Sequence, residues 1–168
     1  MRSEVNIVDL ALQLDTPRKD SLDKCCNIEI KEMIRKQKDS LNGCDLYYFQ
    51  NELYTGWACE IIPDYRHKYR YEQFVNGKMI RRIGYYDNGQ LDADFRMKNC
   101  KNYGPSRMWL YDGKMYIDEF YIAPGVKHGI QKRWYDNGVL AKESKVENGK
   151  IVYEKKYDRS GNFITKEY

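Results

Sequence analysis

Five cysteines and two histidines are the side chains of this sequence best suited to bind a metal ion or attack a substrate. They are Cys25, Cys26, Cys44, Cys59, Cys100, His67 and His128. No two cysteines have C-x-x-C spacing, and the histidines lie far apart in sequence, so we expect no metal site. A pair such as Cys59 with His67 has no supporting motif, and Cys59 suits a small buried strand position. We predict free thiols in a reducing compartment.

Signature motifs of the common enzyme classes do not occur in the sequence. It contains no G-x-S-x-G, no H-E-x-x-H, no P-loop and no Gly-rich dinucleotide turn. We therefore predict a protein that is not an enzyme, with no catalytic residues, no cofactor and no small-molecule substrate.

Acidic side chains recur three residues beyond an apolar one. They are Asp94, Asp118 and Glu143, which follow Leu91, Met115 and Leu140, whereas the last copy has Lys166. We favour cross-strand pairing with bases such as Arg107, Lys132 and Arg133. The alternative is an acidic strip that meets a basic partner.

Aromatic side chains are abundant, with sixteen tyrosines and three tryptophans. Such residues are enriched where proteins bind each other. The aromatic candidates for partner binding are Trp57, Tyr85, Trp109, Tyr116 and Trp134. Packing within a sheet explains each of them equally well. The predicted partner-binding set comprises these five and the three acids.

The charge balance does not indicate a polyanion-binding protein, because the net charge is only +4. One basic group, Arg66, His67, Lys68 and Arg70 with Tyr65, Tyr69 and Tyr71, would suit a lipid or nucleic-acid surface. A second run, Lys31, Arg35, Lys36 and Lys38, is interpreted as the solvated face of a helix in preference to an anion-binding patch. No stretch approaches the length of a membrane span, and we predict a cytoplasmic location.

Residues 1–44 have a helical pattern. Ile7, Leu10, Ala11 and Leu14 lie on one helical face, with Ser3 as N-cap and Pro17 at the end. Ile30, Met33, Ile34 and Leu41 predict a second helix that ends at Asn42-Gly43. Residues 16–24 between them are polar and predict a linker.

Residues 45–168 have the period of β-strands. Leu91, Ala93, Phe95 and Met97 alternate with polar residues directly after Tyr86-Asp87-Asn88-Gly89. Asn-Gly is the strongest short signal for a hairpin, because both turn positions need positive φ. The sequence therefore predicts a β-hairpin here.

The hairpin recurs along the chain. Its tyrosines are Tyr86, Tyr111, Tyr135 and Tyr157, with further turns at Asn76-Gly77 and Asn148-Gly149 and a degraded copy over 48–53. We predict an inward ladder of the pairs Tyr86 with Leu91, Tyr135 with Leu140, and Tyr157 with Phe163. The predicted fold is mainly β, an elongated antiparallel meander of tandem hairpins with a short helical N-terminal segment.

The repeats resemble the MORN-repeat variant of YwqK-type antitoxin proteins, which are bacterial immunity partners of secreted or polymorphic toxins. The matching residues lie at 53–56, 85–91 and 129–140. The copy at Asp112-Gly113 is one residue short, and Arg159-Ser160-Gly161 replaces Asn-Gly in the last copy. The resemblance covers roughly the last three-quarters of the chain.

This resemblance implies a non-catalytic protein that neutralises a cognate toxin by covering it. The alternative is a MORN-like scaffold that binds a membrane or nucleic-acid surface, although nucleic acid is not the partner we expect. Open sheet edges also make a homodimer conceivable.

Overall fold

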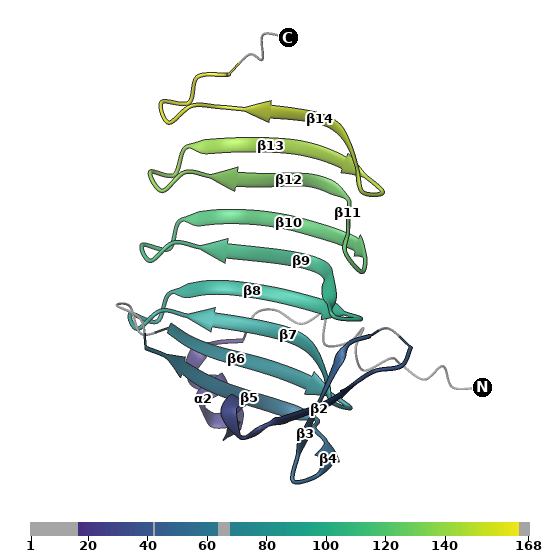
Figure 1. The fold of residues 1–168 in the computed structure, drawn as a ribbon. Helices are drawn as coiled ribbons and strands as arrows, with labels where there is room; N and C mark the ends of the chain where they lie inside the picture. Colours follow the sequence, from purple (N-terminus) through teal and green to yellow (C-terminus); the bar gives the residue numbers. More distant parts are fainter. Residues whose placement is uncertain (1–16, 42, 64–67, 165–168) are drawn as a thin grey trace, which may run out of the picture.

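The computed structural model describes residues 17–41, 43–63 and 68–164, which form one long sheet and one small one (Figure 1). The long sheet is an antiparallel meander in chain order. Its strands are β5 (Gly56–Ile62), β6 (Lys68–Val75), β7 (Lys78–Tyr85), β8 (Leu91–Lys98), β9 (Lys101–Trp109), β10 (Met115–Ala123), β12 (Gly129–Trp134), β13 (Leu140–Glu147) and β14 (Lys150–Lys156), with β11 (Val126–Lys127) beside β10. The predicted mainly β meander is confirmed.

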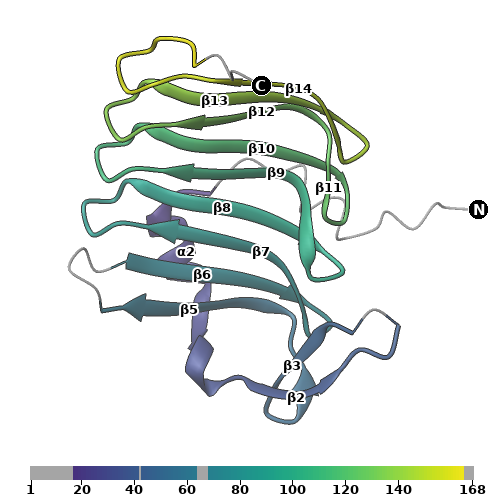
Figure 2. The same ribbon diagram turned by 45° about the horizontal axis from the view of Figure 1, so that its top comes forward.

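The N-terminal part adds strands to this meander. β1 (Cys26–Glu29) pairs in parallel with β5, and a small sheet contains β2 (Ile34–Lys38), β3 (Asp45–Phe49) and β4 (Glu52–Leu53). Figure 2 shows the small sheet at the β5 end of the stack. β1 and β2 thus pair with strands that lie beyond the boundary predicted at residue 45.

The helix predicted over 30–41 is wrong. This stretch forms a 3₁₀ turn, η1 (Ile30–Glu32), and then strand β2, while Leu41 is exposed. The isoleucines favour extended backbone, and Ile30 and Met33 pack against the buried Ile28, Ala58 and Phe74. The basic run therefore lies on η1 and β2. The predicted linker contains helix α2 (Lys19–Cys25), and the helix predicted around Ile7 lies outside the described residues.

Each repeat carries an aromatic–apolar pair across its hairpin. The pairs are Tyr85 with Leu91, Trp109 with Met115, Trp134 with Leu140, and Tyr157 with Phe163. The ladder is therefore confirmed at Tyr157 but is one residue off at Tyr86 and Tyr135. The reason is that Tyr86 is already in the turn, where its N–H donates to Gln90 and its carbonyl accepts from Gly89.

Tyr86 and Tyr135 instead connect one repeat to the next. The Tyr86 hydroxyl donates to the Trp109 carbonyl at 3.1 Å, and the Tyr135 hydroxyl donates to the Tyr157 carbonyl at 2.8 Å. The Asn88 and Asn137 side-chain amides donate to the carbonyls of Tyr111 and Arg159. The recurrent Tyr-Asp-Asn-Gly sequence is thus explained by hydrogen bonds between adjacent corners.

Replacing Tyr135 by phenylalanine is expected to lower the free energy of unfolding by about 0.5–1.5 kcal/mol, because the Tyr157 carbonyl loses its donor. Urea unfolding followed by circular dichroism measures this change. The control is Tyr116→Phe, whose side chain is exposed. Equal stability of Tyr135→Phe and Tyr116→Phe would contradict the role of the Tyr135 hydroxyl in joining adjacent repeats.

The turns at the opposite ends of the strands are also joined to each other by hydrogen bonds. Gly125 N–H donates to the Asn102 carbonyl at 2.9 Å, and Gly149 N–H donates to the Lys127 carbonyl at 2.8 Å. Asn76-Gly77 and Asn148-Gly149 both have positive φ at each residue, as this turn requires. At the corner between β8 and β9 the pair is Asn99-Cys100, and Cys100 has a φ of 59°.

Four of the five cysteines form disulfides, so the prediction of free thiols is wrong for these four. Cys26–Cys59 joins β1 to β5, and Cys44–Cys100 joins the segment before β3 to the β8–β9 turn. The Cα atoms lie 5.9 and 5.6 Å apart, within the usual range. Sequence separations of 33 and 56 residues give no spacing signal from which these pairs could be inferred.

Candidate protein-binding face

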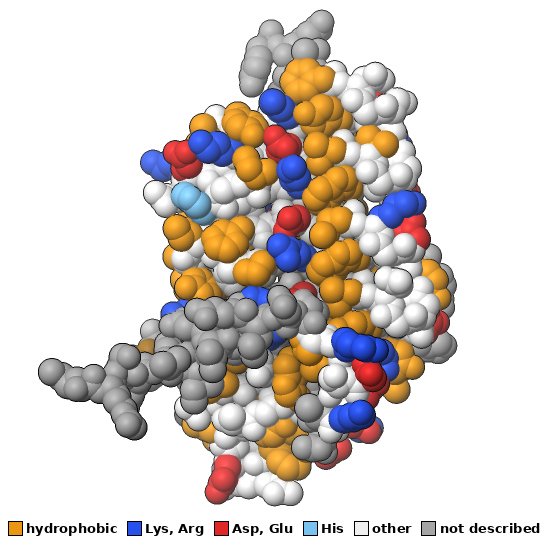
Figure 3. All heavy atoms as spheres, turned by 180° about the vertical axis from the view of Figure 1, so that it is seen from behind, with side chains coloured by type: hydrophobic (Ala, Val, Ile, Leu, Met, Phe, Trp, Pro, Cys, Tyr) orange, Lys and Arg blue, Asp and Glu red, His pale blue; other side chains and the backbone are white. Residues whose placement is uncertain are grey.

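The long sheet has two faces with different characters. We call the face that carries α2 and the aromatic–apolar pairs the aromatic face, which is shown in Figure 3. The opposite face is called the groove face. Since side chains alternate along a strand, paired residues of neighbouring strands lie on the same face.

Helix α2 covers the aromatic face over β5–β7. Leu22 is buried against Tyr71, Ile83 and Tyr85, and Trp57 packs against the same cluster. The Tyr71 hydroxyl donates to the Asp23 carboxylate, and the Tyr85 hydroxyl donates to the Pro17 carbonyl. Burial, together with the nearby Asp94 carboxylate, raises the pKa of Tyr85 to about 12.

Three of the predicted partner-binding residues therefore belong to the core or to its edge. Tyr85 and Asp94 are each 5 % exposed, and Trp57 is half-buried in the α2 cluster. The Asp94 carboxylate accepts two hydrogen bonds from the Arg81 guanidinium, at 2.9 and 2.7 Å. A partner cannot reach Tyr85 or Asp94 without disturbing the fold, which corrects their assignment.

The other two predicted acids form a ladder of alternating charge. Arg107 bonds Asp118 at 2.9 Å, Lys132 lies 3.5 Å from Glu143, and the Tyr153 hydroxyl donates to Glu143 at 3.0 Å. Cross-strand pairing is therefore confirmed for Asp118 and Glu143, whereas Arg133 pairs with Glu119 on the groove face. The acidic-strip alternative is wrong, because bases alternate with the acids.

We call the residues in register across β9–β14 the charge ladder. They are Arg107, Asp118, Lys132, Glu143 and Lys155. A column of alternating blue and red beside a continuous orange column is visible in Figure 3. Both ion pairs of the ladder are partly exposed.

Apolar residues lie on both flanks of the charge ladder. On one side are Trp109 with Met115, Trp134 with Leu140, and Tyr157 with Phe163, most of them half-buried. On the other side Phe120 and Ile130 are each 44 % exposed. Tyr116, at the bulge that follows Met115, is also exposed.

The structure thus brings together five predicted residues and adds two that the sequence did not single out. Trp109, Trp134, Asp118 and Glu143 share the open part of the aromatic face, and Tyr116 lies beside it. Phe120 and Ile130 were missed. The signal was available, because Ile117 and Phe120 place apolar side chains on opposite faces of β10, more than a one-sided strand needs.

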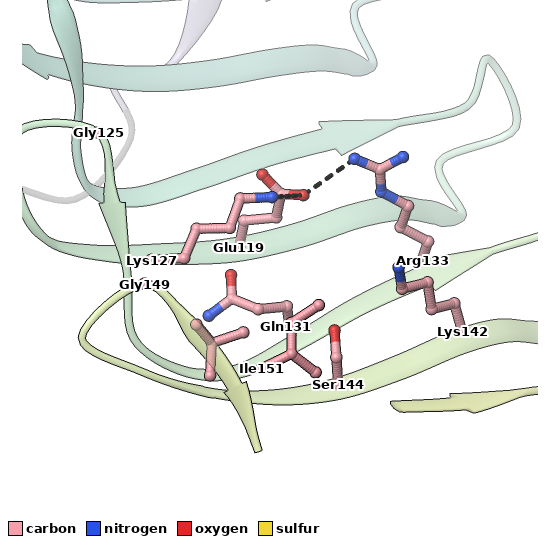
Figure 4. Close-up of a pocket in the computed structure, with 10 residues that line it drawn as sticks. Glu119, Gly125, Lys127, Gln131, Arg133, Lys142, Ser144, Gly149 and Ile151 are labelled. Atoms are coloured by element: carbon pink, nitrogen blue, oxygen red, sulfur yellow. Dashed lines mark hydrogen bonds and ion pairs between the residues drawn. The ribbon is translucent and has the colours of Figure 1, made fainter. Parts of the chain in front are cut away.

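The groove face is hollowed over the C-terminal repeats, with a volume of about 340 Å³ (Figure 4). Glu119 accepts from Lys127 at 2.7 Å and from Arg133 at 3.1 Å, and Lys142 bonds Glu154 at 2.5 Å. The buried Gln131 side chain donates to the His128 carbonyl at 2.7 Å. The charged side chains that line this groove are therefore paired with each other. We assign the groove a structural role and not a binding role.

Glu119 gives the groove a pH dependence. Burial raises its pKa, but hydrogen bonds from Lys127, Tyr121 and Arg133 outweigh burial and hold the pKa below its ordinary value. A lowered carboxyl pKa contributes stability above the ordinary pKa, and this contribution is lost as the pH falls through the folded-state value. Glu119→Gln is expected to remove this part of the acid destabilisation, measured as Tm between pH 3 and 7. If the Tm of Glu119→Gln fell with decreasing pH as steeply as that of the native chain, this role of Glu119 would be contradicted.

The two described members of the basic group, Lys68 and Arg70 of β6, are paired with acids and do not form a free cationic surface. Lys68 bonds Asp92 at 3.2 Å, and Arg70 pairs with both Glu60 and Glu72. Tyr69 and Tyr71 face α2, while residues 65–67 lie outside the described part. Within the described residues, no group of three or more His, Cys, Asp or Glu side chains is placed to hold a metal ion, and no helix is long and apolar enough to cross a membrane.

Comparison with known proteins adds no family. No family model matches the sequence, and no curated protein matches it. Among solved structures, a mutant of S. aureus TarM in complex with fondaparinux, alpha-GlcNAc-glycerol and UDP is 18% identical, with a TM-score of 0.25, covering 89% of this chain and 26% of that one. A second TarM structure is 16% identical with a TM-score of 0.25, covering 86% of this chain and 25% of its own. The chain thus spans about a quarter of TarM, and a likeness this weak supports no inference about activity.

Proposed function

We propose that this chain is a non-catalytic binding module that neutralises a protein toxin by covering it with the open part of the aromatic face. The observation that carries the proposal is the exposure of Phe120 and Ile130, at 44 % each, beside the charge ladder and the tryptophan pairs. Resemblance of the repeats to YwqK-type antitoxins supports a toxin as the partner.

The chemistry of this face suits a protein partner. Exposed large apolar side chains that lie together mark interaction sites, and tryptophan, tyrosine and arginine supply most binding hot spots. The alternating signs of the charge ladder would fix the orientation of a partner, because a shift by one strand would oppose like charges. A polyanion would meet two acids interspersed among the three bases of this ladder.

The cytoplasmic location stays in this proposal on the sequence pattern alone; the two disulfides of the structure oppose it and provide its test. Disulfides persist in oxidising compartments and are rare in the cytosol. Alkylation of Cys44 and Cys100 in intact cells would support the cytoplasm. Full protection from alkylation until reductant is added would place the protein in an oxidising compartment.

The function is tested first by co-purification of the full chain with the products of the neighbouring genes, and then with the toxin identified in this way. Phe120→Ser with Ile130→Ser is expected to weaken its binding at least tenfold in isothermal titration calorimetry, with little change in Tm, because both side chains are exposed. The control is Ile151→Ser, 61 % exposed on the groove face. Greater loss in the control, or strong salt-sensitive retention on liposomes or oligonucleotides, would overturn the proposal.

A further inference from the structure

We infer that the open part of the aromatic face accepts an amphipathic α-helix of the partner, lying across strands β9–β14 along the aromatic–apolar pairs. The inference rests on the proposed function and adds the shape and charge pattern of the segment that is bound. Three observations support it: the packing of α2 on the same face, the spacing of the aromatic–apolar pairs, and the spacing and signs of the charge ladder.

The first observation is that this face already binds a helix. α2 crosses the strands obliquely, from Pro17 at Tyr85 of β7 to Cys26 opposite Trp57 of β5. Trp57 lies four residues along β5 from the position in register with Tyr85. Leu22 of α2 is packed against a cluster that includes Tyr85 and Leu91, the first of the aromatic–apolar pairs. The same pair type continues beyond the end of α2, so the surface on which a helix rests continues with it.

The second observation is the spacing of the pairs. Successive pairs lie two strands apart, which is about 9.6 Å at the usual strand separation. Seven residues of α-helix rise about 10.5 Å, so apolar residues at every seventh position would meet successive pairs. An extended segment returns a side chain to the same face every 6.6–6.8 Å or so and does not match. The period of the sheet therefore favours a helix with a heptad-like apolar stripe.

The third observation is that the spacing of the charges along the ladder matches the spacing of side chains along one side of an α-helix. Its members lie one strand apart, about 4.8 Å, and alternate in sign. Helix residues three or four apart are separated by a rise of about 4.5–6 Å. Acids on the bound helix would face Arg107 and Lys132, and bases would face Asp118 and Glu143.

The charge ladder also distinguishes the partner helix from α2. The residues of the covered repeats at the ladder positions are Tyr71 and Ile83, which present an apolar floor to Leu22. In the open repeats the same register holds Arg107 with Asp118 and Lys132 with Glu143. A bound helix as apolar as the buried side of α2 would remove water from these charges and offer them no polar partner. The side of the bound helix that faces the charge ladder therefore needs charged residues.

The probe for this inference is a synthetic helical peptide of about 21 residues. It has leucine at every seventh position and a flank of alternating Glu and Lys in the order complementary to the charge ladder. The comparison peptides are the same sequence with Glu and Lys exchanged, a scrambled version and a proline-rich peptide. Fluorescence anisotropy with the full chain is expected to show at least tenfold tighter binding of the complementary peptide.

Two variants make the test specific to this face. Lys132→Glu with Glu143→Lys reverses part of the charge ladder and is expected to transfer the preference to the peptide with exchanged charges. Ile151→Ser on the groove face is expected to change nothing. Equal binding of all peptides, preference for the proline-rich one, or no change of preference after charge reversal would overturn the inference.

Failure of the inference is distinguishable from failure of the proposed function. If the toxin binds in a manner sensitive to Phe120→Ser with Ile130→Ser, but hydrogen exchange shows a toxin loop or strand protected on this face, the helix is wrong and the function stands. If the toxin ignores this face altogether, both are overturned.

Discussion

Replacing Asp94 by alanine is expected to lower the free energy of unfolding by about 3–5 kcal/mol, the usual cost of breaking a buried ion pair. The side chains of Arg81 and Asp94 are 3 % and 8 % exposed, and both oxygens of the carboxylate accept from the guanidinium. Removal of the carboxylate leaves a buried guanidinium without this partner, because desolvation of that charge is no longer offset. Urea unfolding monitored by tryptophan fluorescence measures the change.

Asp118 provides the matched control, because it has the same position in the next repeat. Its partner Arg107 is 47 % exposed, and Asp118 itself is 40 % exposed. Asp118→Ala is therefore expected to cost no more than about 1 kcal/mol. The double replacement of Arg81 by methionine and Asp94 by leucine should recover much of the loss, because no charge then stays buried. Equal effects of Asp94→Ala and Asp118→Ala would contradict this account.

These two acids show what a repeat sequence can and cannot reveal. The repeat predicts an acid five residues after the turn glycine in three of its four copies, at Asp94, Asp118 and Glu143. The structure places these three acids in one register across the sheet. Burial differs between the copies: the Asp94 side chain is 8 % exposed, and the Asp118 side chain is 40 % exposed. Because the two acids have the same position in the repeat, the repeat alone could not separate the structural Asp94 from the exposed Asp118.

The register of the hairpins illustrates a second limit. Asn-Gly located the turns at Gly77, Gly89, Gly138 and Gly149 correctly. The pattern around Gly89, however, allowed either Tyr85 or Tyr86 to stand opposite Leu91. Hydrogen bonds of the turn place Tyr86 inside it, which leaves Tyr85 as the last strand residue. A shift of one residue exchanges the two faces. The aromatic ladder was therefore predicted with the right residue type but, at two corners, with the wrong neighbour.

The N-terminal part was predicted least well, because its structure is determined by distant contacts. Ile30 and Met33 have helical spacing, yet they pack against a cluster that includes Ala58 and Phe74 of the long sheet. Trp109, Trp134, Asp118 and Glu143 were identified as surface candidates from type and spacing alone. Phe120 and Ile130 were missed. Apolar residues on both faces of β10 were a signal for Phe120, whereas Ile130 needed the pairing of β10 with β12.

Reduction of the Cys44–Cys100 disulfide is expected to lower the free energy of unfolding by about 3–4 kcal/mol, since a crosslink over 56 residues restricts the unfolded chain. Cys100 stands at a corner where Gly77 and Gly149 occupy the matching turns, and its φ is 59°. A side chain in this region of φ costs about 1–2 kcal/mol, which glycine avoids. The disulfide therefore accounts for a cysteine at a position that otherwise favours glycine.

Cys100→Gly consequently should have opposite effects in the two redox states. Without reductant it is expected to be less stable than the native chain, because the crosslink is lost. With reductant present it should be the more stable of the two, by about 1 kcal/mol, because only the strain is removed. Cys100→Ala is the control: it loses the crosslink but keeps the strain, so it should lie below Cys100→Gly under both conditions. Urea unfolding with and without reductant measures all three proteins, and the same order of stability in both conditions would show that Cys44 and Cys100 are not joined.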